Sequence, residues 1–324
     1  MTTSARLDDL VDRIRRAHRR IRPHVRETPV DRGDALADGE TEIHLKLENV
    51  QHTGSFKLRG ATAKLTTLDD ASRRRGVVTA SSGNHGAAVA WAGRGLGVPV
   101  SVFVPVDAST AKVEAIRRLG AQVELFGDDC VDAEAEARRR AEVTGAVYVS
   151  PYNDLDVVAG QGTVAVELGY QVPPLDALIL SIGGGGLASG VGAWAKQRWP
   201  GVELVAASPS HSAVMRASLE AGKILDLPSF PTLSDGTAGG VEAGSVTFEL
   251  CQDLVDHTPI VDEDAIADAM RLLFAQHHQL VEGAAGVAVA AFLAERDRWR
   301  GARVGIVLCG ANLSIETLRQ VVAT

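Results

Sequence analysis

Short apolar segments rich in β-branched residues alternate with segments of helical periodicity along most of this chain. Strands are expected at 76–80, 100–105, 121–126, 147–149, 177–182, 203–207 and 304–308. Helices are expected between them at 60–68, 110–119, 132–143, 157–168, 187–199, 248–255, 263–278 and 287–294. Because parallel strands need long crossover connections, this alternation predicts an α/β fold with parallel sheets that are covered by helices on both faces.

Length and composition exclude several classes of protein. A chain of 324 residues with 45% hydrophobic side chains can bury a large core. Its net charge of -8 comes without the dense basic run that nucleic-acid binding requires. Residues 7–21 form an amphipathic helical pattern rather than a signal peptide, and no apolar run has the length of a membrane span. Three cysteines do not have the spacing of a disulfide framework or a zinc site, so a cytoplasmic protein is expected.

Four consecutive glycines, Gly183 to Gly186, follow the expected strand 177–182 and precede a helix. Such a stretch lets backbone N–H groups converge on an anion at the helix N-terminus. A tight turn for close packing is the alternative, but a turn rarely needs four glycines in a row. The stretch lacks the patterns of a dinucleotide site and of a nucleotide P-loop. It therefore predicts a binding site for the phosphate of another cofactor.

Lys57 lies in the segment Gly-Ser-Phe-Lys-Leu-Arg-Gly, directly after an alternating polar and apolar segment at 41–48 that predicts a strand. A lysine is usually a solvated surface charge. Here two further polar loops also follow apolar runs, Ser-Ser-Gly-Asn-His-Gly at 81–86 and Cys-Gly-Ala-Asn at 309–312. A phosphate site combined with an activated lysine points to pyridoxal 5'-phosphate, whose aldehyde forms a Schiff base with a lysine amine.

These motifs, together with Glu-Gly-Ala-Ala-Gly at 282–286, resemble those of the serine/threonine dehydratase and serine racemase family. They occur in the same order as in that family and extend over nearly the whole chain. The resemblance implies the fold of the fold-type-II (tryptophan synthase β-like) pyridoxal phosphate enzymes, with two open parallel-sheet α/β domains and the cofactor between them. It implies a large domain formed by residues 1–53 and 153–324. Residues 54–152 would form a smaller inserted domain.

The same resemblance implies roles for individual residues. Lys57 would carry the cofactor and move the α-proton, and Ser82 would act on the opposite face of the substrate. The implied cofactor-binding residues are Phe56, Lys57, Asn84, Gly183, Gly184, Gly185, Gly186, Leu187, Glu282 and Cys309. The implied substrate-binding residues are Ser81, Ser82, Asn84, His85 and Gly239. For His85 an orienting role in the turn is an equal alternative, and a lone cysteine such as Cys309 is ordinarily a small buried hydrophobe.

The predicted activity is that of an ammonia-lyase (dehydratase), which eliminates water from a β-hydroxy-α-amino acid such as serine or threonine and yields a 2-keto acid and ammonia. A neutral thiol at Cys309 would make the cofactor ring a weaker electron sink, which favours elimination over transamination. Amino-acid racemisation is the main alternative, because Ser82 matches the reprotonating residue of racemases in this family. Replacement of the β-substituent by a sulfur nucleophile and a silent phosphate-binding regulator are further alternatives.

Three positions differ from what the resemblance implies. Family members that bind a divalent cation carry carboxylates where this chain has Ser208 and Val214, so no metal site is expected. Gly239 replaces a serine that racemases tend to have near the substrate, which suggests room for a bulkier β-hydroxy amino acid. The long polar loop at 225–244 is itself expected to serve function. The partners are expected to be a small amino-acid substrate and a second copy of the chain in a homodimer, with neither nucleic acid nor membrane.

Overall fold

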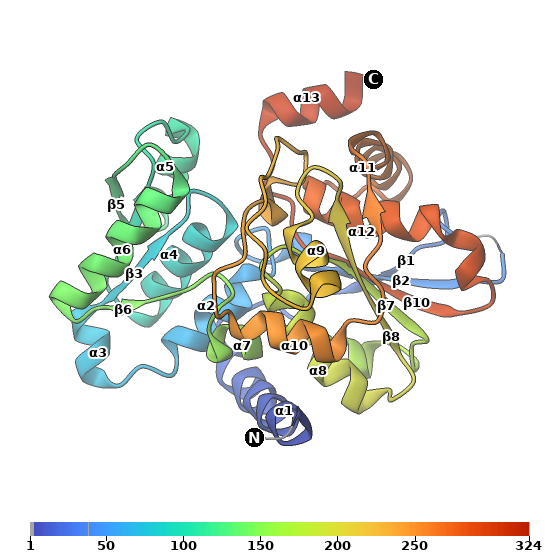
Figure 1. Cartoon of the computed structure of the whole chain (residues 1–324), viewed down its shortest axis with the longest axis horizontal. Coiled ribbons are helices and arrows are strands. Elements are labelled where there is room, and N and C mark those ends of the chain that lie inside the picture. The colour runs from blue at the N-terminus through green and yellow to red at the C-terminus, as the bar shows by residue number, and fades with distance from the viewer. Residues whose placement is uncertain (1–2, 38, 324) are drawn as a thin grey trace.

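The computed structural model describes residues 3–37 and 39–323, and it contains two β-sheets that lie side by side, each with its own helices (Figure 1). The strands are β1 (Val30–Arg32), β2 (Glu42–Leu47), β3 (Val77–Ala80), β4 (Val100–Val104), β5 (Gln122–Leu125), β6 (Val147–Tyr148), β7 (Ala177–Ser181), β8 (Glu203–Pro209), β9 (Ile260–Val261) and β10 (Arg303–Leu308). Among the residues described, no helix has both the length and the apolar character needed to cross a bilayer.

The helices are distributed over both sheets. The α-helices are α1 (Thr3–Ile21), α2 (Lys57–Leu65), α3 (Asp70–Arg75), α4 (Asn84–Leu96), α5 (Thr110–Arg118), α6 (Cys130–Thr144), α7 (Leu155–Gln171), α8 (Gly186–Arg198), α9 (Val214–Ala221), α10 (Val246–Leu254), α11 (Glu263–His277), α12 (Gly283–Ala294) and α13 (Ile315–Ala323). Short 3-10 turns are η1 (Glu48–Val50), η2 (Asp235–Thr237) and η3 (Arg296–Trp299). In Figure 1, α1 and α13 lie at opposite ends of the molecule.

The larger sheet has six strands in the order β1-β2-β10-β7-β8-β9, parallel except for the antiparallel pair β1 and β2. Leu308 of β10 pairs with Leu47 of β2, and Ser181 of β7 pairs with Ala207 of β8, so these strands end at one edge. The segments that follow them carry the lysine motif, the glycine loop and Cys309. Ligands of open α/β sheets bind at this carboxyl edge.

The smaller sheet has the order β5-β4-β3-β6 and is parallel throughout. Its strand β3 ends at Ala80, so the loop 81–83 and the first residue of α4, Asn84, also lie at a carboxyl edge. The alternation predicted two parallel α/β units, and both sheets have that architecture. The antiparallel strand β1, together with β9, α9 and α13, was not predicted, because each is short or carries little apolar periodicity.

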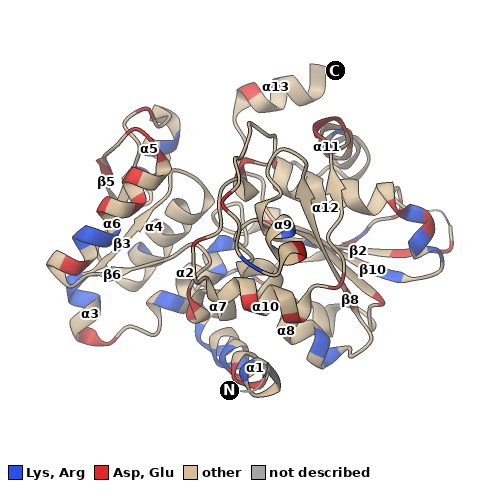
Figure 2. Ribbon diagram, viewed as in Figure 1, with Lys and Arg blue, Asp and Glu red and all other residues tan. Residues whose placement is uncertain are grey.

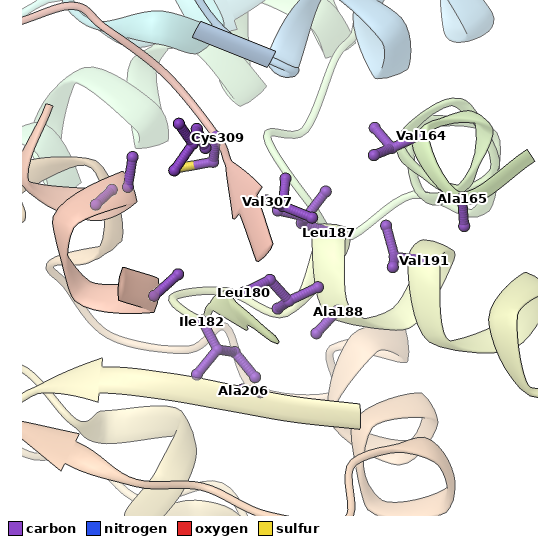
Figure 3. Close-up of a cluster of buried hydrophobic side chains, with 14 of the residues drawn as sticks. Val164, Ala165, Leu180, Ile182, Leu187, Ala188, Val191, Ala206, Val307 and Cys309 are labelled. Atoms are coloured by element: carbon purple, nitrogen blue, oxygen red, sulfur yellow. The ribbon is translucent and has the colours of Figure 1, made fainter. Parts of the chain in front are cut away.

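The core of the larger unit lies between its sheet and the helices α7, α8 and α12. Figure 3 shows part of it, where Leu180 and Val307 of adjacent strands lie near Leu187 and Val191 of α8. Helix α12 is buried around its whole circumference from Gly283 to Phe292. Charged side chains lie mostly on the outer helices and on loops (Figure 2), as burial of apolar surface requires.

Strand β2 differs from the half-exposed strand that its alternating sequence suggests, because both of its faces are buried. Lys46, on the face opposite Leu45, is completely buried, and its Nζ donates to Glu167 at 2.7 Å and to the Thr28 carbonyl at 2.7 Å. A buried cation is tolerated only when it is paired in this way. Lys46 of β2 therefore faces a buried ionic cluster rather than solvent, whereas Glu42, at the start of the strand, is partly exposed and pairs with Arg32.

Candidate active site

A pocket lies where the carboxyl edges of the two sheets meet. Its walls come from seven separated segments of the chain. The lining residues are Phe56, Lys57, Asn84, Tyr152, Ser181, Ile182, Gly183, Gly184, Gly185, Gly186, Leu187, Ala188, Gly236, Thr237, Glu282, Ala284 and Cys309. The pocket thus brings together every residue that the sequence analysis assigned to the cofactor.

Lys57 is the first residue of α2, so its side chain starts at a helix end that faces the pocket. Its Nζ donates to the carbonyl oxygen of Pro151 at 3.1 Å and lies 5.3 Å from the centre of the Phe56 ring. Burial lowers the pKa of Lys57 to about 8, against attraction from Cys309 and Glu282 that would raise it. A lysine with this pKa is partly neutral near physiological pH, as a nucleophile or base must be.

The glycine loop connects β7 to α8, and its backbone conformation requires glycine. Gly185 has φ +84°, in the left-handed region. A Cβ on Gly184 would lie 2.3 Å from the ring of Tyr152, so no larger residue fits there without movement. Thr247 Oγ1 donates to the Gly184 carbonyl at 2.6 Å and holds the loop from the other side. The loop leads directly into the N-terminus of α8, where an anion is favoured.

A hydrogen-bond network joins Asn84 to two residues from the C-terminal half of the chain, the buried Glu282 and the exposed Asn312. Asn84 Nδ2 donates to both carboxylate oxygens of Glu282, at 2.8 and 2.9 Å, and the backbone N–H of Asn312 donates to the same carboxylate at 3.0 Å. Asn312 Nδ2 in turn donates to Asn84 Oδ1 at 2.5 Å. Burial raises the pKa of Glu282 to about 7, and the hydrogen bonds from Asn84 and Asn312 oppose that rise.

Cys309 follows β10 directly and is completely enclosed by protein. Its Sγ lies 3.7 Å from Ser181 Oγ, at the end of β7, and its carbonyl oxygen accepts from the N–H of Phe56 at 3.0 Å. Burial raises the pKa of the Cys309 thiol well above its ordinary value. The thiol is therefore neutral, and it presents a weakly polar group to the pocket rather than a charge.

A cluster of four buried charges lies behind the lysine motif. The completely buried guanidinium of Arg59 donates to Glu48 at 2.8 Å and to Glu167 at 2.7 Å, and Lys46 also contacts Glu167. Burial alone would raise the pKa of Glu167, but hydrogen bonds and charges from Arg59 and Lys46 hold it below its ordinary value. This cluster ties the start of α2, and with it Lys57, to β2 and α7.

Apart from Asn84, the residues that were assigned to the substrate lie outside the wall of this pocket. Ser81 and Ser82 are half-buried in the turn between β3 and α4, and neither is part of the pocket wall. His85 is buried, its Nε2 lies 2.9 Å from the Val149 carbonyl, and burial lowers its pKa to about 3. Its ring is therefore neutral, and it is held by the residue that follows β6. Gly239 is exposed, and a Cβ there would meet no atom within 4 Å.

Sequence reasoning missed seven residues of the pocket wall, and three of these contact the glycine loop or Cys309. Tyr152 packs against Gly184 and Gly186, Ser181 lies beside Cys309, and the backbone of Thr237 lies against Gly183. Ser181 is the last residue of the strand before the glycines, so its position gave a usable signal. Tyr152 and Thr237 lie in loops without periodicity, and only the tertiary structure brings them to the pocket.

The pocket fits the group that the motifs imply. Pyridoxal phosphate needs an amine for its aldehyde, a backbone site for its phosphate and a group beside its ring nitrogen. Lys57, the glycine loop and Cys309 offer these three features in one pocket. At the expected cation positions, Ser208 and Val214 are buried without a carboxylate of their own. Over 3–37 and 39–323, no group of three or more His, Cys, Asp or Glu side chains is arranged to hold a metal ion.

Comparison with known proteins agrees with this geometry. Residues 21–310 match the family model described as pyridoxal-phosphate dependent enzyme. L-threonine ammonia-lyase of Thermotoga maritima is 39% identical over 310 residues, covering 95% of this chain and 77% of that protein. Serine racemase of Oryza sativa subsp. indica is 37% identical over 312 residues, covering 94% of this chain and 91% of that protein.

A solved structure, that of threonine deaminase isoform 2 from Solanum lycopersicum, superimposes with a TM-score of 0.94 at 30% identity. The superposition covers 99% of this chain and 94% of that one. A match of this extent at this identity covers both sheets and the pocket between them. The chain belongs to the pyridoxal-phosphate-dependent enzymes of fold type II.

Proposed function

We propose that this enzyme is an ammonia-lyase that removes water from a β-hydroxy-α-amino acid and releases a 2-keto acid and ammonia. The observation that carries the proposal is the partly neutral Lys57 amine beside a glycine loop and a neutral thiol. The similarity to L-threonine ammonia-lyase supports serine and threonine as reference substrates. We also propose the division into a large part, 1–53 with 153–324, and an inserted part, 54–152, which the two separate sheets support.

Each residue has a defined task in this proposal. Bound pyridoxal phosphate would supply the electron sink for the charge left when the α-proton is removed. Lys57 would hold the aldehyde and then take the α-proton, Phe56 would pack beside the ring, and Gly183–Gly186 with Leu187 would hold the phosphate. Asn84, oriented by Glu282, would hold the substituent oxygen of the ring, and Cys309 would lie at its nitrogen.

Ser81 and Ser82 lie in the turn after β3, and His85 lies next to Asn84 in the first turn of α4. These three residues would bind the substrate carboxylate. Loss of the β-hydroxyl together with the α-proton amounts to loss of water, and hydrolysis of the resulting enamine yields the keto acid and ammonia. Because Cys309 is neutral, it would not stabilise a protonated ring nitrogen as a carboxylate would. This favours prompt elimination over a reaction that needs a long-lived carbanion.

Amino-acid racemisation is a second candidate, and the similarity to serine racemase of Oryza sativa favours it. In that reaction Ser82 would return a proton to the face opposite Lys57. Elimination and racemisation begin with the same proton removal, so one site accommodates both.

The deciding experiment measures both products from the same reaction. The enzyme loaded with pyridoxal phosphate is incubated with L-serine, L-threonine and a bulkier β-hydroxy amino acid. Keto acid and ammonia are then measured, together with the D-enantiomer by chiral chromatography. We expect keto acid and ammonia in equal amounts from at least one substrate. A D-amino acid without keto acid would assign racemisation instead, and no product from any substrate would reject both activities.

We further propose that the enzyme is a cytoplasmic homodimer. Exposed apolar side chains on and beside the contacting helices α11 and α13, including Phe274, Leu280, Ile315 and Val322, support a second copy as partner. Such a concentration of exposed apolar residues is typical of protein interfaces. Sedimentation equilibrium should give twice the mass of one chain, and a charged residue at Phe274 should shift the mass to that of one chain.

A further inference from the structure

The loop of residues 238–245 runs along the side of the larger unit that faces the smaller one (Figure 1). Both ends of this loop contact the glycine loop. At one end, the Thr237 backbone lies so close that a Cβ on Gly183 would be 2.8 Å from its carbonyl oxygen. At the other end, Thr247 donates to the Gly184 carbonyl. The position of the loop is therefore coupled to the proposed phosphate site.

Glu242, in the middle of this loop, contacts three residues outside it. Its Oε1 accepts from Arg138 of α6 at 3.0 Å, and its Oε2 accepts from Asn153 Nδ2 at 2.8 Å. Its backbone N–H donates to the Tyr152 hydroxyl at 2.9 Å, and Tyr152 packs against Gly184 in the pocket wall. One side chain thus joins the loop to a helix of the smaller unit and to the segment between the two units.

Within the larger unit, the start of this loop is held by the N–H of Gly239, which donates to the hydroxyls of Ser212 at 3.1 Å and Ser229 at 3.2 Å. Gly239 and Gly244 flank Glu242 with φ of +120° and +72°, and a Cβ on either would meet no atom within 4 Å. The residues of the loop are largely exposed, apart from Val241 and Ser245. Few buried contacts and glycines on both sides are features of a segment that opens at low free-energy cost. Beyond Gly239, the polar contacts of Glu242 therefore hold the middle of the loop and join it to the smaller unit.

We propose that residues 238–245 form a lid over the cofactor site and that Glu242 is the positioning residue that holds this lid closed against α6. A second contact between the units supports the assignment. Lys112 of α5 lies 3.5 Å from Asp235, just before the lid, so both α5 and α6 reach across to this part of the chain. The consequence for catalysis rests on the proposed ammonia-lyase function, whereas the closure of the lid itself does not.

Breaking the Glu242 contacts should shift the lid toward an open state. If only the closed state binds substrate productively, the apparent affinity falls in proportion to the closed fraction. Partly exposed ion pairs are weak, so the expected factor is modest, up to about fivefold. KM should rise by this factor, while kcat, once the lid has closed on the substrate, should stay within about twofold.

The test is hydrogen–deuterium exchange on the protein loaded with pyridoxal phosphate, without substrate. The amides of Glu242 and Val246 donate to Tyr152 and Asn153, so they report lid opening directly. Glu242→Gln, which keeps the size of the side chain, should speed exchange in 238–246 by up to about fivefold. Glu220→Gln is the matched control, because Glu220 pairs with Arg216 within α9 at 2.6 Å.

Arg138→Gln and the double variant complete the design. If Glu242 acts through Arg138, exchange in the double variant should be no faster than in Arg138→Gln alone. Lid exchange in Glu242→Gln that equals exchange in Glu220→Gln overturns the inference, whatever the activity. Faster lid exchange in an enzyme that releases no keto acid from any amino acid would leave the lid in place and reject the ammonia-lyase function.

Discussion

The side-chain amide nitrogen of Asn84 donates to the carboxylate of Glu282 and lies 2.8 and 2.9 Å from its two oxygens, although 198 positions separate the two residues. The contact joins the first turn of α4 in the smaller unit to the residue before α12 in the larger one. A charged acceptor orients an amide more firmly than a neutral one does. The protonation state of Glu282 therefore determines how firmly Asn84 is held in the pocket.

This relationship predicts a pH dependence. Burial raises the pKa of Glu282 to about 7, so the carboxylate takes up a proton as the pH falls through that value. Its hold on Asn84 then weakens, and kcat/KM of the parent enzyme should fall below about pH 7. Glu282→Gln is neutral at every pH and should lower kcat/KM at pH 8 by about tenfold. Profiles from pH 5.5 to 9 check this, and a limb near pH 7 that persists in the variant would contradict it.

Replacement of Lys57 should remove the absorbance of the lysine-linked cofactor and the turnover of the enzyme together. Lys57→Ala should fold and retain pyridoxal phosphate through the glycine loop. It should lose the absorbance of the lysine-linked cofactor and at least about a thousandfold in kcat, because no other amine lines the pocket within the described chain. Lys223→Ala, at an exposed site, is the control. Added methylamine should restore part of the turnover, and full activity of Lys57→Ala without amine would rule out this role.

Local sequence predicted those parts of the site whose reactive or phosphate-binding residues directly follow a recognisable strand. Lys57, the glycines and Cys309 each follow an apolar strand, and the carboxyl ends of parallel strands meet at one edge. Sequence did not predict the burial of Lys46, because its partner Glu167 lies 121 positions away. The role of Tyr152 beside the glycine loop was hidden for the same reason: only the packed structure sets that distance.

The glycine loop should tolerate no side chain at Gly184. A Cβ there would lie 2.3 Å from the Tyr152 ring, so in Gly184→Ala either the loop or the ring must move. The dissociation constant for pyridoxal phosphate should rise by about tenfold or more. Gly201→Ala, where a Cβ meets no neighbour, should leave it unchanged. Equilibrium titration of both variants decides the matter, and equal affinities would mean that the glycines serve only as a turn.

Removal of divalent cations should leave the enzyme unaffected. Ser208 and Val214 offer no carboxylate, and hard cations need charged oxygen ligands. Treatment with a chelator, followed by added magnesium or calcium, should change neither activity nor melting temperature beyond the error of measurement. A loss on chelation that magnesium reverses would reveal ligands other than these two positions.

The buried cluster behind Lys57 should be the costliest part of the site to disrupt. Arg59→Met leaves Glu48 and Glu167 buried without the guanidinium that pairs both of them. Removing one partner from a buried ion network lowers the free energy of unfolding by about 3–5 kcal/mol. Arg94→Met, at an exposed position of α4, should change it by less than about 0.5 kcal/mol.

Urea unfolding of the cofactor-loaded variants measures this difference. Arg59 also anchors the first turn of α2, two residues after Lys57, so the remaining folded enzyme should show a shifted absorbance of the lysine-linked cofactor. A stability loss with an unchanged spectrum would limit Arg59 to a structural role. Unfolding free energies that match those of Arg94→Met would mean that the two carboxylates find other partners, and that the cluster does not hold α2 in place.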